Sequence, residues 1–325
     1  MVATEQGVRL PAYRDLDTER CAPYRSAWGV FGANDQVGTL NLLTPDVVRA
    51  AAALVQRGVV FPLNWRLDLP DPPILGRNRL HRTVVELDPR PNPGTDDLFD
   101  SFYTQASSQW DALCHVGHRQ YGYYNGRVFD DVITRHEDGI DQWATRGIAG
   151  RFILVDLARY RESIGSSLPP DQRVAVTADE LEATLASEGV SLRQGDILLL
   201  RFGWIRWYTN LDEAGRARLV DPILFPTPGL SSDESTAEWL WDHHVAALAA
   251  DCPAMEAMPF DKSSMATFLH YRLIVFLGMA VGELFDLERL AADCAQTRVY
   301  EGFFTAAPLN FPGGAGSTSN ALAIV

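Results

Sequence analysis

The stretch Phe152-Ile-Leu-Val-Asp-Leu157 is a nearly unbroken apolar run. Such a run is typical of a strand that is covered on both faces of a sheet. Thr177-Ala-Asp-Glu180 then has the pattern of a capping box, which predicts a helix to about Ser187. A second apolar run, Ile197-Leu-Leu-Leu-Arg201, follows the turn residues Gly195-Asp196 and predicts another buried strand. The order strand, helix, strand predicts an α/β architecture.

The same alternation continues on both sides of this stretch. Toward the C-terminus we expect a helix over residues 235–242 and a third buried strand over residues 245–250. Toward the N-terminus, Thr44-Pro45-Asp46 supplies a cap residue, a first-turn proline and a carboxylate near the positive helix end. These residues predict a helix over 47–56, and a strand begins at 59–61.

Three further segments have no helix or strand periodicity. Residues 1–30 mix proline, arginine and acidic side chains and are expected to form an N-terminal arm. Residues 88–97 are expected to form a loop, and residues 312–320 also have a loop-like composition. We therefore predict one domain over residues 31–325, with a mixed sheet and flanking helices.

The composition of the 325 residues excludes several classes of protein. The apolar content of 46% permits a sizeable core, and the formal charge of −14 disfavours nucleic acid and anionic membranes as partners. No basic segment followed by an apolar run opens the chain, and the apolar segment at 273–285 is too short to span a bilayer. The cysteines form no CxxC pair, so a cytoplasmic, reducing setting is expected. They are Cys21, Cys114, Cys252 and Cys294.

A polar motif, Gln105-Ala-Ser-Ser-Gln109-Trp110-Asp111-Ala-Leu-Cys-His115, is the main candidate site. Its four polar groups with metal or proton affinity occupy odd positions, so an extended segment would direct them to one face, with Trp110 on the other. One carboxylate, two amides and an imidazole in a shared cavity are costly to bury unless they bind something. A divalent metal ion with a water molecule is the simplest ligand that these groups could bind.

His270 and Glu283 form a second cluster, in a mostly apolar part of the sequence. A carboxylate there needs a cation, a metal or hydrogen-bond donors. Two alternatives stay open: Glu283 could pair with a buried arginine such as Arg201 or Arg272, and His270 alone could be a core histidine. Separated His and Asp/Glu groups are, however, what a catalytic metal site is built from.

Four stretches together resemble the putative cyclase family of metal-dependent hydrolases, which includes kynurenine formamidases, isatin hydrolases and trans-dienelactone hydrolases. They are Gly38-Thr-Leu-Asn-Leu-Leu-Thr-Pro45, the motif at 105–115, Gly282-Glu283-Leu-Phe-Asp286-Leu-Glu, and the terminus from Gly316 to Asn320-Ala-Leu-Ala-Ile. The resemblance implies a single α/β domain with the family's swivelling β/β/α arrangement. It also implies a small-molecule substrate and assembly as a homodimer or homotetramer.

Formamidases of this family carry the pattern HxxxHxDxxxH, with a distant His and Glu. The chain matches it at Asp111, His115, His270 and Glu283, but Gln105 and Gln109 replace the first two histidines. The QxxxQxDxxxH pattern is similar to that of the zinc-dependent trans-dienelactone hydrolase branch. Zn²⁺ is therefore the expected cofactor, and an oxygen-rich ligand set would also accept Mn²⁺.

The expected function is metal-dependent hydrolysis of a small cyclic ester or amide, with a lactone first. Gln105, Gln109, Asp111, His270 and Glu283 are the expected metal ligands. A metal-bound water would attack the carbonyl while His115 moves its proton, so Asp111, His115 and Glu283 are the expected catalytic residues. Two alternatives are a metal-free cyclase or lyase that uses these three residues for proton transfer, and an inactive homologue that binds a small molecule.

Neighbouring residues offer weaker candidates. His118 could replace a lost ligand or be an ordinary loop histidine. Cys114 is expected to point away from the site and to be no nucleophile. The tyrosines at 121, 123 and 124, with Trp110, could form a substrate wall or part of the core.

Overall fold

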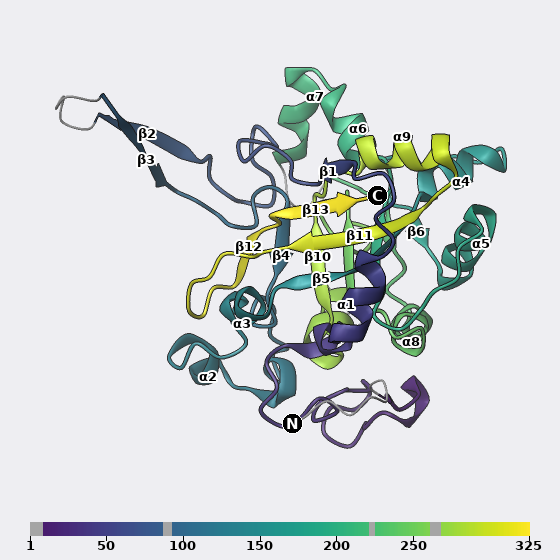
Figure 1. Ribbon diagram of the computed structural model, residues 1–325. Coiled ribbons are helices and arrows are strands. Elements are labelled where there is room, and N and C mark those ends of the chain that lie inside the picture. The colour runs from purple at the N-terminus through teal and green to yellow at the C-terminus, as the bar shows by residue number, and fades with distance from the viewer. Residues whose placement is uncertain (1–8, 87–92, 221–224, 261–267) are drawn as a thin grey trace.

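The computed structural model describes residues 9–86, 93–220, 225–260 and 268–325. Within these ranges, nine strands form one curled mixed sheet in the order β1-β13-β11-β5-β7-β9-β10-β4-β12 (Figure 1). The order along the chain is β1 (Val60–Pro62), β4 (Gln109–Asp111), β5 (Ile148–Val155), β7 (Ile197–Leu200), β9 (Ala247–Ala250), β10 (Ala280–Glu283), β11 (Glu301–Ala306), β12 (Gly316–Thr318) and β13 (Ala321–Ile324). The predicted α/β class is confirmed.

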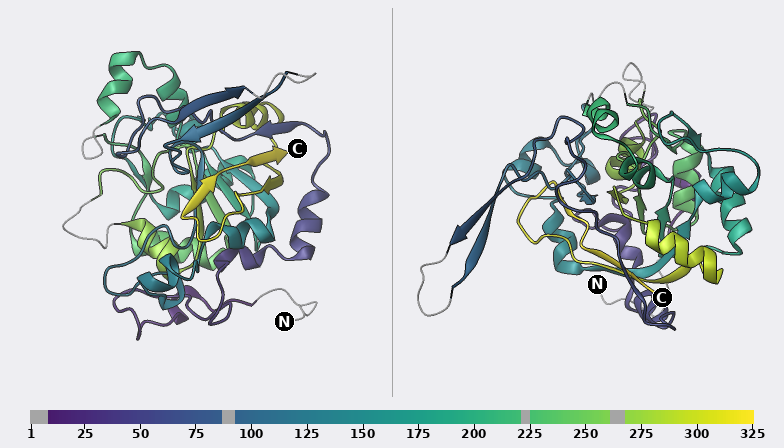
Figure 2. Two further views of the ribbon diagram at one scale, coloured as in Figure 1. Left: turned by 90° about the vertical axis from the view of Figure 1, so that its left-hand side faces the viewer. Right: turned by 90° about the horizontal axis from the view of Figure 1, so that it is seen from above.

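Helices flank this sheet and connect its strands (Figures 1 and 2). They are α1 (Pro45–Ala52), α2 (Phe129–Ile133), α3 (Ile140–Arg146), α4 (Leu157–Ser163), α5 (Ala178–Glu188), α6 (Trp204–Thr209), α7 (Glu213–Ala217), α8 (Glu234–Asp242) and α9 (Glu288–Thr297). A π-helical turn covers Tyr271–Phe276 just before β10. Helix α1 packs on β5 and β11, and α5 packs on β5.

The parallel core of the sheet follows the predicted apolar runs. Strands β5, β7, β9 and β10 pair in parallel, and the side chains of β7, β9 and β10 are all buried. Apolar residues can fill every position of these strands because both faces of the sheet are covered. The strands expected over residues 152–157, 197–201 and 245–250 are thus confirmed to within a few residues.

Two helix predictions need correction in detail. Helix α1 begins as expected, with the Thr44 hydroxyl accepting the Val47 N–H at 3.3 Å, but it ends at Ala52 instead of residue 56. Helix α5 begins after Thr177, yet that side chain makes no cap hydrogen bond. The Glu180 carboxylate binds the Arg161 guanidinium at 2.8 Å, so the expected capping box does not form.

Two of the expected loops contain strands. Residues 95–97, predicted as loop, lie in β3 (Thr95–Asp100), which pairs with β2 (His81–Glu86) in an antiparallel hairpin; residues 88–92 lie outside the described residues. The hairpin projects from the body of the molecule (Figures 1 and 2) and exposes Val84, Val85, Leu98 and Phe99 by 41–52%. Within the expected C-terminal loop, β12 forms the sheet edge beside β4.

The part of the N-terminal segment from residue 9 onward packs on the domain. Tyr13, Leu16, Cys21, Tyr24 and Trp28 are buried. The indole N–H of Trp28 donates to the Val275 carbonyl at 2.7 Å. The division into an arm over residues 1–30 and a domain over residues 31–325 stays a prediction. A further small sheet pairs β6 (Ala175–Val176) with β8 (Gly229–Leu230).

Candidate metal centre

Strands β4 and β10 lie side by side and carry three of the predicted site residues. Gln109 and Asp111 are two positions apart on β4, so their side chains share one face. Glu283 on β10 is paired with Gln109, whose amide Nε2 donates to Glu283 Oε2 over 2.6 Å. The Met255 backbone N–H donates to Glu283 Oε1 at 3.0 Å. All three polar side chains are buried, so the sheet holds them in the interior of the protein.

His270 approaches this face from the helical position directly before the π-helical segment. Its Nε2 lies 3.2 Å from Glu283 Oε1 and 3.9 Å from Asp111 Oδ2. Its Nδ1 lies 2.6 Å from a carboxylate oxygen of Glu256. The ring of Phe268 stacks on the imidazole at a centroid distance of 4.8 Å, which fixes the plane of the ring. The imidazole is thus oriented from two sides with Nε2 toward the carboxylates.

Asp111, His270 and Glu283 offer ligand atoms that all lie within 4.8 Å of one another. Both carboxylate oxygens of Asp111 and the amide oxygen of Gln109 are buried without a hydrogen-bond partner. Buried polar oxygens normally have a partner, so three unpaired oxygens around one imidazole fit a divalent cation.

The electrostatics of the cluster also favour a cation. Burial raises the pKa of the Asp111 carboxyl, because a charged group loses its hydration there, while the charges of His115 and His270 oppose the shift. Burial disfavours the protonated form of His270, but the carboxylates of Glu256 and Glu283 outweigh it and raise the pKa of His270. Three buried carboxyl groups share one imidazole, and a cation beside them would favour the ionised form of Asp111.

The motif at 105–115 is not one extended segment. Strand β4 covers only Gln109–Asp111, and Trp110 points into the core on the opposite face, against Trp143, Phe285 and Phe304. Gln105 and His115 lie in the turns on either side, so the predicted alternation over all eleven residues was wrong. The opposite directions of Trp110 and its two neighbours are confirmed.

The turns nevertheless bring Gln105 and His115 together. Gln105 Nε2 lies 3.3 Å from His115 Nδ1, and the Thr104 hydroxyl donates to Gln105 Oε1 at 2.9 Å. His115 Nε2 lies 3.6 Å from Asp111 Oδ1, and its side chain is 26% exposed. His115 therefore stands at the accessible edge of the cluster, whereas Asp111, at 0% exposure, lies at its floor.

Glu256 is a site residue that the sequence patterns do not indicate. It is fully buried. The backbone of Gly229 packs directly against the backbone of Glu256: a Cβ at position 229 would lie only 2.3 Å from the Glu256 carbonyl carbon. Its carboxylate accepts a hydrogen bond from the Nδ1–H of His270, as in the carboxylate–histidine–metal arrangement. An acidic residue in the apolar stretch Cys252-Pro-Ala-Met-Glu256 is the one signal that could have marked it.

Several alternative assignments fail. Arg201 binds Asp156 and Glu288, and the Arg272 guanidinium lies over the Tyr24 ring, so neither pairs with Glu283. The Cys114 thiol contacts the Gly314 carbonyl at 3.5 Å, and burial raises the pKa of that thiol to about 12, so Cys114 is no nucleophile.

His118 lies among aromatic rings rather than ligands. Its ring stacks on Tyr121 and meets Tyr24 and Tyr271 edge-on. Burial lowers the pKa of His118. Within the described residues it is absent from the Asp/His/Glu group that could hold a metal.

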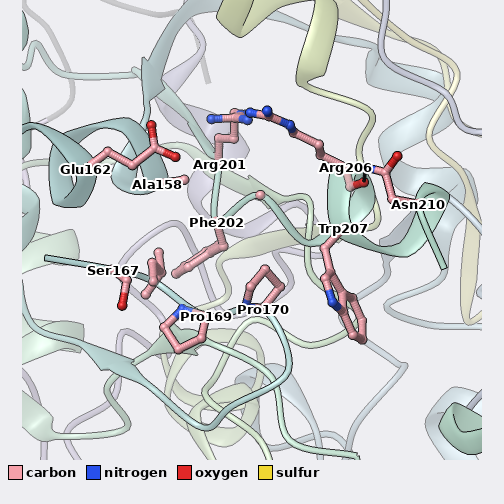
Figure 3. A pocket seen from close by; sticks show the side chains of 12 residues that line it. Ala158, Glu162, Ser167, Pro169, Pro170, Arg201, Phe202, Arg206, Trp207 and Asn210 are labelled. Atoms are coloured by element: carbon pink, nitrogen blue, oxygen red, sulfur yellow. Dashed lines mark hydrogen bonds between the residues drawn. The ribbon is translucent and has the colours of Figure 1, made fainter. Parts of the chain in front are cut away.

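A separate cavity of about 320 Å³ lies between α4 and α6 (Figure 3). Arg201 and Arg206 line one side of it, and Pro169 and Pro170 line another. It contains none of the residues of the Gln105–His115 motif, and its arginine at 201 is already paired with carboxylates. The cavity therefore shares no residue with the predicted site.

A family model described as "Putative cyclase" matches residues 49–257. The chain belongs to this cyclase family. A crystal structure of "a novel cyclase" is 33% identical, has a TM-score of 0.81, and the alignment covers 92% of this chain and 99% of that one. A search of curated proteins gives no match.

Isatin hydrolases share the fold of this cyclase-family protein. Isatin hydrolase A from Labrenzia aggregata, bound to benzyl benzoate, is 17% identical with a TM-score of 0.58 over 88% of this chain and 99% of that one. An isatin hydrolase bound to the product analogue thioisatinate is 18% identical, with a TM-score of 0.56 over 82% and 92% of the two chains. Within the described residues, no helix is both long and apolar enough to cross a bilayer.

Proposed function

We propose that the protein is a metal-dependent hydrolase that opens a small cyclic ester or amide, with a lactone as the first choice. The observation that carries the proposal is the buried Asp111, whose two oxygens have no hydrogen-bond partner and face His270 and Glu283. Membership of the cyclase family and the fold shared with isatin hydrolases support hydrolysis of a ring.

Asp111, His270, Glu283 and Gln109 would hold the ion. Gln109 already donates its Nε2–H to Glu283, and this hydrogen bond fixes the amide with its unpaired oxygen free for a cation. When bound, Zn²⁺ or Mn²⁺ supplies a Lewis acid that polarises a carbonyl and lowers the pKa of water. Gln105 contacts His115 and Thr104, and its place in the ligand set stays a proposal.

His115 is the residue that we assign to proton transfer. To accept a proton at Nε2, which faces the cluster, its Nδ1 must carry the hydrogen. A flip of the Gln105 amide, which exchanges Oε1 and Nε2, would turn its oxygen to the ring to accept that Nδ1–H and its nitrogen to the Thr104 hydroxyl. Gln105 would then select the tautomer of His115 that acts as a base and later returns the proton to the leaving oxygen or nitrogen.

We place the chain in the trans-dienelactone hydrolase branch of the family. The two glutamines at positions 105 and 109 of the QxxxQxDxxxH pattern support this placement. An amide oxygen is a weaker zinc ligand than imidazole, so the branch assignment also makes Mn²⁺ an acceptable ion.

The test combines metal content with hydrolysis. Protein purified without chelators should contain about one Zn²⁺ or Mn²⁺ per chain and open at least one member of a lactone and cyclic-amide panel. Chelation should abolish the rate, and His115→Ala should lower it by about 10²–10⁴-fold. His81→Ala, on the exposed hairpin, is the matched control and should leave the rate unchanged.

Other outcomes identify the alternatives. A protein that turns over a substrate without any metal would be the proton-transfer cyclase or lyase. A protein that binds ring compounds but has no rate above background would be the inactive homologue. Either result, or a wild-type rate in His115→Ala, would overturn the proposal.

We further propose a cytoplasmic homodimer or homotetramer. All four cysteines are free, which suits a reducing compartment. The exposed valines, leucine and phenylalanine of the β2–β3 hairpin support an interface, because a two-stranded ribbon is marginally stable alone in water. Light scattering of the purified protein should give two or four times the 36.0 kDa chain mass; a monomer would contradict this.

A further inference from the structure

Gly316 lies on β12 at the edge of the sheet, in the C-terminal motif that has no part in the proposed function. It is buried and is paired with Asp111 on β4. Its φ lies outside the left-handed region that favours glycine, so the backbone there would accept other residues. The space around Gly316, by contrast, excludes a side chain. A Cβ on Gly316 would lie 2.5 Å from Gln105 Nε2 and 2.6 Å from the Trp110 carbonyl oxygen.

The amide atom that occupies this space also contacts His115. Gln105 Nε2 lies 3.3 Å from His115 Nδ1, and the Thr104 hydroxyl donates to the other end of the amide, Oε1, at 2.9 Å. The Gln105 amide is thus enclosed by the backbone of β12, the His115 ring and the Thr104 hydroxyl. Its place against the ring therefore depends on the missing side chain at position 316.

A methyl group at position 316 would have to displace one of its two neighbours. The Trp110 carbonyl belongs to β4, which pairs with β10 on one side and β12 on the other. The Gln105 amide is the end of a side chain, and rotation about its χ angles moves it at small cost. We therefore expect the amide to move. Its contact with His115 is easily broken, because a hydrogen bond is lost at about 3.6 Å.

We propose that Gly316 is a positioning residue for His115: the absence of a side chain on β12 keeps the Gln105 amide against Nδ1, where it sets which imidazole nitrogen carries the hydrogen. After the amide flip described above, the atom at this place is the oxygen that accepts the Nδ1–H. The inference rests on the proposed function, in which His115 transfers the proton. It also gives the C-terminal motif a role in the site.

The first test compares Gly316→Ala, Gln105→Ala and the variant that carries both, with Zn²⁺ in excess. Each single substitution should lower kcat about 5- to 10-fold, which is the effect of one lost hydrogen bond. KM should change little, because the amide orients a base and not the substrate. The double variant should lose no more than Gln105→Ala, because the methyl group at position 316 acts only through the amide.

Gly302 on β11 supplies the matched control. A Cβ there would lie 2.7 Å from the Ile324 carbonyl oxygen, so it would clash with a neighbouring strand as a Cβ on Gly316 does. Its other near neighbour is the Phe152 ring, at 2.6 Å, instead of Gln105. Gly302→Ala should lower the stability of the fold but leave kcat per folded molecule unchanged. An equal loss of kcat would assign the effect to strain in the sheet and overturn the inference.

Two other kinetic outcomes would contradict the role of Gly316. Losses that add up in the double variant would mean that Gly316 acts without Gln105. A loss that excess metal removes would mean that the amide acts as a ligand and not on His115. If Gly316→Ala does not fold, the double variant decides. Folding of the double variant would show that the amide needs the space, whereas its failure to fold would show that only the pairing with Trp110 needs it and would overturn the inference.

A measurement without hydrolysis separates failure of this inference from failure of the proposed function. The nitrogen NMR signals of the His115 imidazole, recorded in alkaline solution where imidazoles are neutral, show which nitrogen carries the hydrogen. Gly316→Ala and Gln105→Ala should both shift the signals from the Nδ1–H form toward the Nε2–H form, and Gly302→Ala should not. Unchanged signals in Gly316→Ala, or a wild type already in the Nε2–H form, would overturn the role of Gly316 whether or not the protein hydrolyses a substrate.

Discussion

Two groups of carboxylates lie beside the same large sheet, and they differ in the partners that the protein gives them. At the ends of β5 and β7, Arg201 binds Asp156 at 2.7 Å and holds both oxygens of Glu288 at 2.8 and 2.9 Å. At β4 and β10, Asp111 and Glu283 face an imidazole and an amide, and no arginine of the described chain contacts them.

The difference separates a structural charge cluster from a binding site. A guanidinium of the chain satisfies the first group permanently, so that cluster needs nothing from solution. The second group keeps two Asp111 oxygens unpaired, which costs stability unless a cation arrives. Buried carboxylates alone therefore do not mark a functional site; among the described residues, the candidate site differs in that its carboxylates have no arginine partner.

The strongest test of this contrast is Asp111→Asn. We expect kcat/KM to fall by at least about 10⁴-fold, because the ion loses a charged ligand. The metal-free variant should be as stable as the metal-free wild type, or more stable by about 1–2 kcal/mol, since a neutral amide replaces a buried carboxylate without donors. Urea unfolding of chelated protein measures this, and a clear loss of stability would show that Asp111 is structural.

The second test acts on the structural cluster. Arg201→Gln should destabilise the protein by about 3–5 kcal/mol, because the buried Asp156 and the half-buried Glu288 lose the guanidinium that joins them. The activity per folded molecule should stay close to wild type. Arg159→Gln removes a 47% exposed partner of Asp156 and should cost less than about 1 kcal/mol. Similar losses in both variants would show that the buried Arg201 contributes no more to stability than the exposed Arg159.

The third test concerns Glu256, whose carboxylate contacts Nδ1 of His270. Glu256→Gln keeps the shape of the side chain but replaces the carboxylate that orients His270. We expect a 10- to 100-fold weaker affinity for Zn²⁺, measured by competition with a chelator. Glu162→Gln, beside the cavity at Arg206, is the control, and an equal shift there would contradict a specific role of Glu256.

The smallest expected effect lies beside the structural cluster, at Glu188. Its Oε1 accepts the Asp156 N–H at 2.8 Å, its Oε2 is buried without a partner, and burial raises the pKa of Glu188 to about 8. The folded state therefore keeps a proton that the unfolded state releases near pH 4.5, and stability falls as the pH rises from about 4.5 to 8.

Glu188→Gln removes this dependence and keeps an oxygen that can accept the same N–H. The stability of the variant relative to wild type should therefore be about 1–2 kcal/mol higher at pH 9 than at pH 5, after allowance for the partial exposure of the side chain. Urea titrations at the two pH values measure the change. If the free energies of unfolding of variant and wild type differ by the same amount at both pH values, the predicted role of Glu188 is refuted.

The sequence predicts the parallel core well because the physics there is local. The apolar runs at 152–157, 197–201 and 245–250 can only be strands or helices inside the protein, and their lengths and flanking turns select strands. The hairpin is missed because Thr95-Asp96-Asp97 has the composition of a loop. Its pairing with β2 depends on cross-strand contacts that no single segment displays.

The site is predictable in its residues more than in its geometry. Asp111, His270 and Glu283 come from the motif and the resemblance, and the structure brings their ligand atoms together. The alternation of side chains holds only where β10 and β12 flank β4. Glu256 could not be found, because its importance arises from a contact with His270 that forms only in the folded chain.

The β2–β3 hairpin makes the molecule a suitable host for an inserted reporter. His81 is paired with Asp100, so the chain leaves the body and returns to it at neighbouring points. A compact fluorescent domain whose own termini are close could replace the residues between His81 and Asp100. The flanking segments would then stay in place. Because the proposed subunit interface would be removed with these residues, such a chimera would let the concentration of the protein be followed by light in its monomeric form.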